Sequence, residues 1–492
     1  MCKSHFYKKM RKRLIIVILI LINAAMDAEP EAMVKKVDKA VSVLFILIMI
    51  VAAWRWAVSV HTWSLMGTLA SLVCLGLFVW TGLRAIPALT GYISSGNTQD
   101  PVTIDSLPEE RQRIWWKIVL WVVASRVLLI LIAYVFWMLK DGGSGSLFSR
   151  FIDTWHIRGI DAMSYLGIAE HGYVTEGDSR FHIVFLPLFP VVIKLAQFFT
   201  GNYMVAGFVA ANLCTLAAAL FAYELARLDM GRSNALRVVK YIFIFPSAFF
   251  FFIPMTEALF LLLSLMALYY VRQKRWLLGC LCAALAGFTR SPGILLAVPV
   301  AVEFARDLAA GYRQMERKAF TNRVIKAVLS LATVSFGLLA YLYINYNVTG
   351  NAFQFSIYQR EHWSQQFYFF FDTVRYQMEY AVNTFKDADY RSFLGLWLPN
   401  LLSIFLVLFM MFKSAKKLQP AYMAYLIVYF VYVVGPTWLL SAPRYFAVAF
   451  PLAFAAVLLT KDSKRKDIAL TSIFIAGSLL YLAVFVSGYP VY

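Results

Sequence analysis

Thirteen runs of apolar residues are long enough, or nearly long enough, to cross a lipid bilayer, and they constrain the fold more than any other feature. About 20 apolar residues span a bilayer as a helix. The mean hydropathy of the 492 residues is +0.68 and only 15% of them are charged, whereas soluble proteins have roughly 25%. A soluble enzyme, a secreted disulfide-rich protein and a disordered chain are therefore excluded. We expect an all-α polytopic membrane protein.

The expected spans are 41–60, 64–83, 114–139, 204–227, 237–253, 255–271, 276–289, 292–305, 324–346, 393–412, 420–440, 444–460 and 468–487. The runs 276–289 and 292–305 are short and meet at a Pro/Gly break, so they form two short spans or a single broken helix. The five cysteines show no spacing typical of a metal site or of a disulfide framework.

Basic residues favour one side of these spans. If the amino terminus is cytoplasmic, 32 of the 46 Lys and Arg residues fall in the inner loops, as the positive-inside rule expects. The net charge of +19 therefore reflects membrane topology, and nucleic acid is not an expected partner. We predict a multi-pass protein of the plasma membrane with long loops on the extracytoplasmic side.

This alternation requires that residues 183–199 do not cross the membrane. The stretch contains Pro187, Pro190 and Lys194, so we interpret it as a helix that lies on or dips into the outer face. A broken spanning helix is the alternative. Near the amino terminus, a basic cluster precedes the apolar run Leu14–Asn23, a pattern that resembles a signal peptide. We predict that this run does not span and that Met33 is a second possible start.

Composition divides the chain near residue 110. Residues 1–110 are expected to form an extension with two spans, and residues 111–492 a helical body with outer loops 140–203 and 347–392. No clear internal repeat is present in the sequence, which argues against an inverted-repeat transporter.

The first outer loop carries the densest group of polar residues. Its sequence runs Asp153-Thr-Trp-His156-Ile-Arg158-Gly-Ile-Asp161-Ala-Met-Ser-Tyr165 and continues to Glu170-His171. Asp161 and Tyr165 share one helical face, and Asp161 is expected near the amino end of a short helix, where the helix dipole favours an ionised carboxylate. A carboxylate close to a bilayer needs a partner or a function. The sequence leaves open whether Asp161 is catalytic or structural.

Three further charged residues stand beside helix breaks on the same side: Glu257, Arg290 and Arg444. Each alone is equally well a capping or snorkelling side chain. Together they are more specific, because arginines bind anionic phosphate and a carboxylate can deprotonate a hydroxyl. The set predicts chemistry on a lipid-linked phosphate at the outer leaflet.

These segments resemble, in order and spacing, the motifs of the GPI mannosyltransferase 2 (PIG-V-like) family over about residues 114–460. The family's W-D-A-x-x-Y-L-x-I-A-x-x-G-Y loop is similar to Arg158-Gly-Ile-Asp161-Ala-Met-Ser-Tyr165-Leu-Gly-Ile-Ala-Glu-His171-Gly172-Tyr173. Its other motifs resemble Phe185-Leu-Pro187-Leu-Phe-Pro190, Phe245-Pro-Ser-Ala-Phe249, Met255-Thr-Glu257, Thr289-Arg290-Ser-Pro-Gly293 and Pro443-Arg444-Tyr445. The aromatic residue that usually precedes the loop aspartate is Ile160 here.

The resemblance implies a GT-C type glycosyltransferase. Such an enzyme moves a hexose, with mannose as the expected sugar, from a polyprenyl-phosphate donor to an acceptor hydroxyl with inversion. The resemblance implies that Asp161 is the general base, and we infer that Arg290 and Arg444 hold the leaving phosphate. Arg158, Tyr165, His171 and Glu257 are further candidates for substrate contacts. The acceptor is left open among a glycolipid, a cell-envelope glycan and a protein.

No cofactor is expected, although His156, His171, Asp153 and Asp161 keep a divalent metal open in the first loop. Two other functions remain as alternatives. A transporter or lipid flippase requires charged residues inside the spans, for which Arg126 is the main candidate. A polysaccharide polymerase or ligase would use a pyrophosphate-linked oligosaccharide instead.

Overall fold

A computed structural model describes residues 30–60, 64–95, 108–142, 145–157, 160–312 and 314–492. Within these ranges every regular element is an α, 3₁₀ or π helix, and the isolated β-bridge joins Phe367 to Pro436. The expected all-α class is confirmed. The predictions about Leu14–Asn23 and Arg158 concern residues outside the described ranges.

Seven helices of the described ranges are long and apolar enough to cross a membrane by themselves, as a multi-pass protein requires. They are α2 (Pro30–Ser59), α3 (Leu65–Ser94), α4 (Pro108–Asp141), α8 (Tyr203–Arg227), the joined α13 (Arg317–Ala332) and α14 (Phe336–Thr349), the segment that ends in α18 (Leu398–Ser414), and α22 (Lys464–Val486).

The remaining expected spans correspond to shorter helices. These are α9 (Arg232–Phe243), α10 (Glu257–Arg272), α11 (Trp276–Thr289), α12 (Ala297–Tyr312), α19 (Pro420–Val434), α20 (Ala442–Ala447) and α21 (Pro451–Thr460). Length and composition therefore support seven spans, or eight with one bent pair, and the count of thirteen stays a prediction.

Prolines explain where the expected spans are interrupted. The run 237–253 is not one helix, because α9 ends at Phe243 and the 3₁₀ helix η3 (Ala248–Phe251) follows Pro246. The run 444–460 is divided into α20 and α21, with Pro451 as the first residue of α21. Proline has no backbone N–H to donate and its ring crowds the preceding turn, so it interrupts a helix even in an apolar environment.

The stretch around residues 183–199 is sharply bent. The 3₁₀ helix η2 (Asp178–Val184) and α7 (Leu188–Thr200) enclose an angle of 108°, with Pro187 between them. The interruption agrees with the proline pattern. Whether the pair lies at the membrane surface or forms a broken span stays a prediction.

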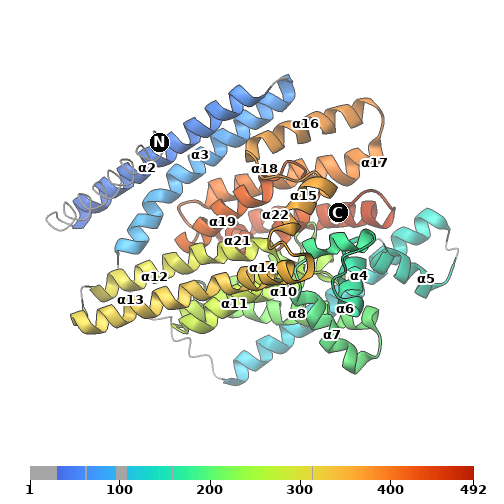
Figure 1. Cartoon of the computed structure of the whole chain (residues 1–492), viewed down its shortest axis with the longest axis horizontal. Helices are drawn as coiled ribbons and strands as arrows, with labels where there is room; N and C mark the ends of the chain where they lie inside the picture. Colours follow the sequence, from blue (N-terminus) through green and yellow to red (C-terminus); the bar gives the residue numbers. More distant parts are fainter. Residues whose placement is uncertain (1–29, 61–63, 96–107, 143–144, 158–159, 313) are drawn as a thin grey trace.

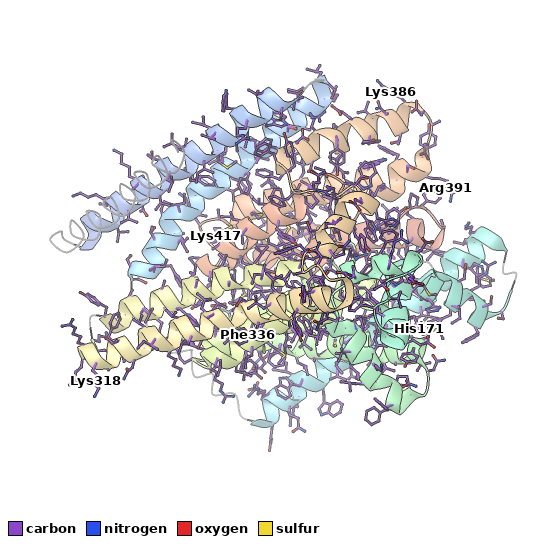
Figure 2. The ribbon with its side chains drawn as sticks, in the orientation of Figure 1. His171, Lys318, Phe336, Lys386, Arg391 and Lys417 are labelled. Atoms are coloured by element: carbon purple, nitrogen blue, oxygen red, sulfur yellow. The ribbon has the colours of Figure 1, made fainter. Side chains whose placement is uncertain are left out.

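The two kinds of loop lie at opposite ends of the molecule. Lys318, which belongs to a predicted inner loop, lies at one end of the long axis (Figure 2). Lys417, from another predicted inner loop, lies in the same half of the molecule but nearer its middle. His171, Lys386 and Arg391, which belong to the predicted outer loops, lie at the other end. The fold thus separates the two sets of loops as expected, and which end faces the cytoplasm stays a prediction.

Both long outer loops are built of helices. The first contains α5 (Leu147–Phe151), the π helix η1 (Ile152–Ile157), α6 (Ile160–His171), η2 and α7. The second contains α15 (Gln354–Trp363), α16 (Phe370–Lys386) and α17 (Tyr390–Ser392), and it leads through the π helix η6 (Phe393–Trp397) into α18.

The amino-terminal helices α2 and α3 pack beside α16 (Figure 1). Nε1 of Trp56 donates to Asp372 at 2.8 Å, and the hydroxyl of Ser71 donates to the carbonyl of Phe371 at 2.6 Å. These buried polar contacts attach the extension to the second outer loop. The division of the chain near residue 110 stays a prediction.

Candidate active site

Helix α6 presents Asp161 in its first turn, as the sequence predicted. The peptide dipoles of the helix favour negative charge at this end. The helix ends at His171 because Gly172 has a φ of +76°, a left-handed conformation that glycine adopts without strain. A π helix, η1, lies immediately before α6 along the chain, and such π turns are frequent at functional sites.

Asp161 is the outermost member of a chain of four charged side chains. Nη2 of Arg444 donates to Oδ2 of Asp161 at 2.5 Å. Nε of Arg444 lies 2.7 Å from Oε1 of Glu257, and Nη1 of Arg290 donates to the same carboxylate oxygen. Residues that are far apart in the sequence therefore form one continuous ionic network.

Three members of this network, Glu257, Arg290 and Arg444, lie at helix breaks. Glu257 is the first residue of α10, and Arg290 is an extended residue between α11 and the 3₁₀ helix η4 (Ser291–Leu296). Arg444 belongs to the six-residue helix α20. Breaks turn these side chains away from the helix surfaces and into a common space, which is why they meet.

The break after Arg290 depends on close backbone contact. A Cβ atom at Gly293 would overlap the backbone of Ala286 and Gly287, so only glycine allows η4 to fold back against α11. The Nη1 group of Arg290 also donates to the hydroxyl of Thr256 at 3.0 Å. This second contact fixes the guanidinium next to the first turn of α10.

Burial differs strongly along the network. The side chain of Glu257 is 0% exposed and that of Arg290 is 6% exposed, whereas Asp161 retains 24% exposure. Two arginines and two carboxylates have no net charge, and this balance is what makes burial of such charges tolerable. Asp161 is the member that an external substrate reaches most readily.

Glu257 has an unused acceptor. Among the described residues no donor hydrogen-bonds to its Oε2 atom, which is buried. Buried polar atoms are nearly always satisfied, and an exception requires an explanation such as a bound ligand.

Two buried amide side chains, which no sequence motif marks, hold the segment that carries Arg444. The backbone N–H of Ala442 donates to Oδ1 of Asn400 at 3.0 Å, and the side chains of Asn400 and Gln377 both donate to the carbonyl of Leu439. They hold the loop that leads into α20. Nothing in the local sequence marks them, because their partners lie 39 to 62 residues away.

The other predicted site residues have different surroundings. Tyr165 is 5% exposed and packs edge-on against Phe185 and Phe189, with its hydroxyl 3.5 Å from that of Thr256. The side chain of His171 is 70% exposed, and its Nε2 atom lies 3.7 Å from the carboxylate of the adjacent Glu170. The structure therefore places Tyr165 beside the network and His171 at the far end of α6. The side chain of Arg158 lies outside the described residues.

Within the described ranges, no group of three or more His, Cys, Asp or Glu side chains is arranged to hold a metal ion. Burial lowers the pKa of His156 below its ordinary value, so this imidazole is neutral at pH 7. Its Nδ1 atom is buried without a hydrogen-bond partner in the described part of the chain.

No protein-family model and no curated protein matches this sequence. The chain is similar to solved structures of an oligosaccharyltransferase from Archaeoglobus fulgidus. The apo form has a TM-score of 0.40 at 13% identity and matches 75% of this chain and 56% of that one. The form tethered with an acceptor peptide containing the NVT sequon has a TM-score of 0.39 at 14% identity over 75% and 55%.

A third structure, described as the archaeal oligosaccharyltransferase AglB in complex with an inhibitory peptide and a dolichol-phosphate, has a TM-score of 0.35 at 12% identity over 75% and 56% of the two chains. The present chain thus spans about half the length of these proteins. Similarity this low assigns neither a family nor an activity. A function for this protein must therefore be inferred from the residues of the site.

Proposed function

We propose that this protein is an integral-membrane glycosyltransferase of the GT-C type. In this proposal it moves a hexose, with mannose as the expected sugar, from a polyprenyl-phosphate donor to the hydroxyl of a lipid or cell-envelope glycan. The observation that supports it most strongly is the network of Asp161, Arg444, Glu257 and Arg290. The site faces the extracytoplasmic side in the orientation predicted from the basic loops.

Asp161 acts as the general base in this proposal. Its Oδ2 atom is held by Arg444, and the carboxylate is the most exposed of the network. The acceptor oxygen loses its proton to Asp161 and forms a bond to the anomeric carbon. The bond from that carbon to the phosphate oxygen breaks, the polyprenyl phosphate leaves with the bonding electrons, and the configuration inverts.

Arg444 couples deprotonation of the acceptor by Asp161 to departure of the phosphate. Its guanidinium is shared between Asp161 and Glu257. When Asp161 accepts a proton, the negative charge next to Arg444 disappears, and the arginine has more positive potential to offer the leaving phosphate. Preorganised charge of this kind is commonly the largest contribution to catalysis. Arg290 supplies a second guanidinium, fixed by Glu257 and Thr256.

The test is the variant Asp161→Asn, which keeps the size of the side chain and removes its basicity. We expect transfer of mannose from polyprenyl-phosphate mannose to fall by roughly 10²–10⁴-fold, with unchanged expression and membrane insertion. Asp178→Asn, at the exposed start of η2, is the matched control and should retain full activity. Unchanged transfer by Asp161→Asn would remove the proposed mechanism.

One observation favours the transporter alternative. Arg126 lies in the middle of α4, and its Nε and Nη2 atoms are buried without hydrogen-bond partners in the described part of the chain. Its guanidinium instead lies over the ring of Phe243, at 5.6 Å from the centroid. Sugar transfer by purified protein in detergent, where no second compartment exists, separates an enzyme from a transporter.

A further inference from the structure

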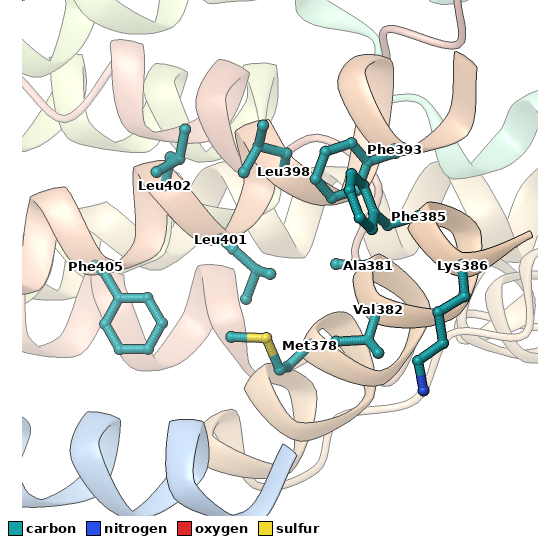
Figure 3. Close-up of a pocket in the computed structure, with 10 residues that line it drawn as sticks. All are labelled: Met378, Ala381, Val382, Phe385, Lys386, Phe393, Leu398, Leu401, Leu402 and Phe405. Carbon is teal, nitrogen blue, oxygen red and sulfur yellow. The ribbon is translucent and has the colours of Figure 1, made fainter. Parts of the chain in front are cut away.

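A groove of about 580 Å³ lies between α16 and α18, away from the ionic network (Figure 3). Its walls are apolar side chains of these two helices, among them Met378, Val382, Phe385, Leu398, Leu402 and Phe405 (Figure 3). Lys386 is the one charged residue among those that line it. An apolar cavity of this size with a single polar group at its edge is typical of a ligand site.

The chemistry of the groove fits an amphipathic lipid. Lys386 is in the last turn of α16, at the same end of the molecule as Arg391 and His171 (Figure 2). In the predicted topology this end is the outer membrane surface. Its ammonium group is exposed and has no ion-pair partner among the described residues. An apolar slot in the bilayer with a cation at the headgroup level complements an acyl chain bonded to a phosphate headgroup.

The groove and the ionic network lie on opposite sides of α18. Leu398, Leu402 and Phe405 recur at intervals of three and four residues, so they share one face of the helix. Asn400 is half a turn away from this face and binds the backbone N–H of Ala442, at the start of the helix that carries Arg444. A lipid in the groove is therefore distinct from the polyprenyl-phosphate donor, whose phosphate binds Arg290 and Arg444. This distinction rests on the proposed function.

We propose that this groove binds one acyl chain of an anionic phospholipid of the outer leaflet, with the lipid phosphate at Lys386. In this proposal the binding is separate from sugar transfer. Because α16 and α18 also supply Gln377 and Asn400 to the loop before Arg444, the lipid lies between the two helices that position this arginine.

The experiment uses the full chain in nanodiscs that contain phosphatidylglycerol with a photoreactive diazirine in one acyl chain. Cross-linked peptides are mapped by mass spectrometry. We expect saturable labelling of α16 and α18 at the groove, reduced about five-fold by Lys386→Gln through loss of one headgroup contact and retained by Lys386→Arg. Leu402→Trp, at a position that is 61% exposed, should fill the groove and abolish this labelling.

Leu480→Trp on α22, at a position that is 70% exposed, is the matched control and should not change the labelling. Equal labelling by a diacylglycerol analogue without phosphate, or no effect of Lys386→Gln, would show ordinary contact with bulk lipid and overturn the proposal. Stronger labelling by a diazirine-bearing polyprenyl phosphate would assign the groove to the donor and overturn it as well. Labelling does not depend on catalysis, so its failure is distinguishable from failure of the proposed function.

Discussion

Glu257 is the residue on which the network depends most. Both guanidinium groups converge on this fully buried carboxylate. Removing one partner of a buried ion pair leaves an uncompensated charge, which typically costs about 3–5 kcal/mol. The second oxygen of the same carboxylate, Oε2, has no hydrogen-bond partner among the described residues.

We therefore expect Glu257→Gln to lower stability by about 3–5 kcal/mol, measured as thermal unfolding of the purified protein in detergent. Asp161→Asn should have a much smaller effect on unfolding, because this side chain remains 24% exposed and solvent screens its charge. Equal stability of Glu257→Gln and the unchanged protein would contradict the role of Glu257 as the counter-charge of two buried arginines.

Among the helices, the close packing of α14 against α11 positions Arg290. Gly337, the second residue of α14, is buried against α11, and a Cβ atom there would overlap the carbonyl oxygen of Ala284. Small residues allow such contacts between membrane helices, where packing replaces the hydrophobic effect as a driving force. Because α11 ends at Thr289, its placement against α14 also places Arg290.

We expect Gly337→Ala to destabilise the protein and lower sugar transfer, because α14 must move away from α11. Gly76→Ala is the matched control, since a Cβ atom there meets no other atom within 4 Å. In that variant the higher helix propensity of alanine, worth up to about 1 kcal/mol, is the main change. Thermal unfolding and transfer assays of both variants check this expectation, and identical behaviour of the two would contradict it.

The sequence predicted the helical class and the helix breaks because apolar runs, prolines and charges are local signals. Glu257, Arg290 and Arg444 are predicted from the same local signals, since each stands beside a break in the apolar pattern. Asp161 is predicted from the dense polar group of the first outer loop. The sequence did not reveal that Asn400 and Gln377 hold the loop before Arg444, because an amide in an apolar helix does not indicate its distant partner. It also placed His171 in the site, whereas the helix carries this residue away from Asp161.

For the whole molecule, the distribution of basic residues predicts its orientation in the membrane. Lys386 and Lys417 lie in opposite halves of the structure along its long axis (Figure 2), and both side chains are exposed. The positive-inside rule assigns the half with Lys417 to the cytoplasmic side. This orientation decides which leaflet supplies the lipid donor.

We expect Lys386→Cys to react with a membrane-impermeant maleimide in intact cells, and Lys417→Cys to react only after the membrane is opened. The unchanged protein reports the background from its own cysteines, of which Cys74, Cys280 and Cys282 are buried. The reverse labelling pattern would invert the topology and place the proposed site on the cytoplasmic side.

The most direct measurement of the central claim is transfer of sugar by the purified full chain from two donors. One donor is polyprenyl-phosphate mannose, and the other is an oligosaccharide linked to the lipid through a pyrophosphate. We predict transfer from the monophosphate donor, loss of that transfer in Asp161→Asn, and no turnover of the pyrophosphate donor. Turnover of the pyrophosphate donor alone would contradict the account and favour a polymerase or ligase.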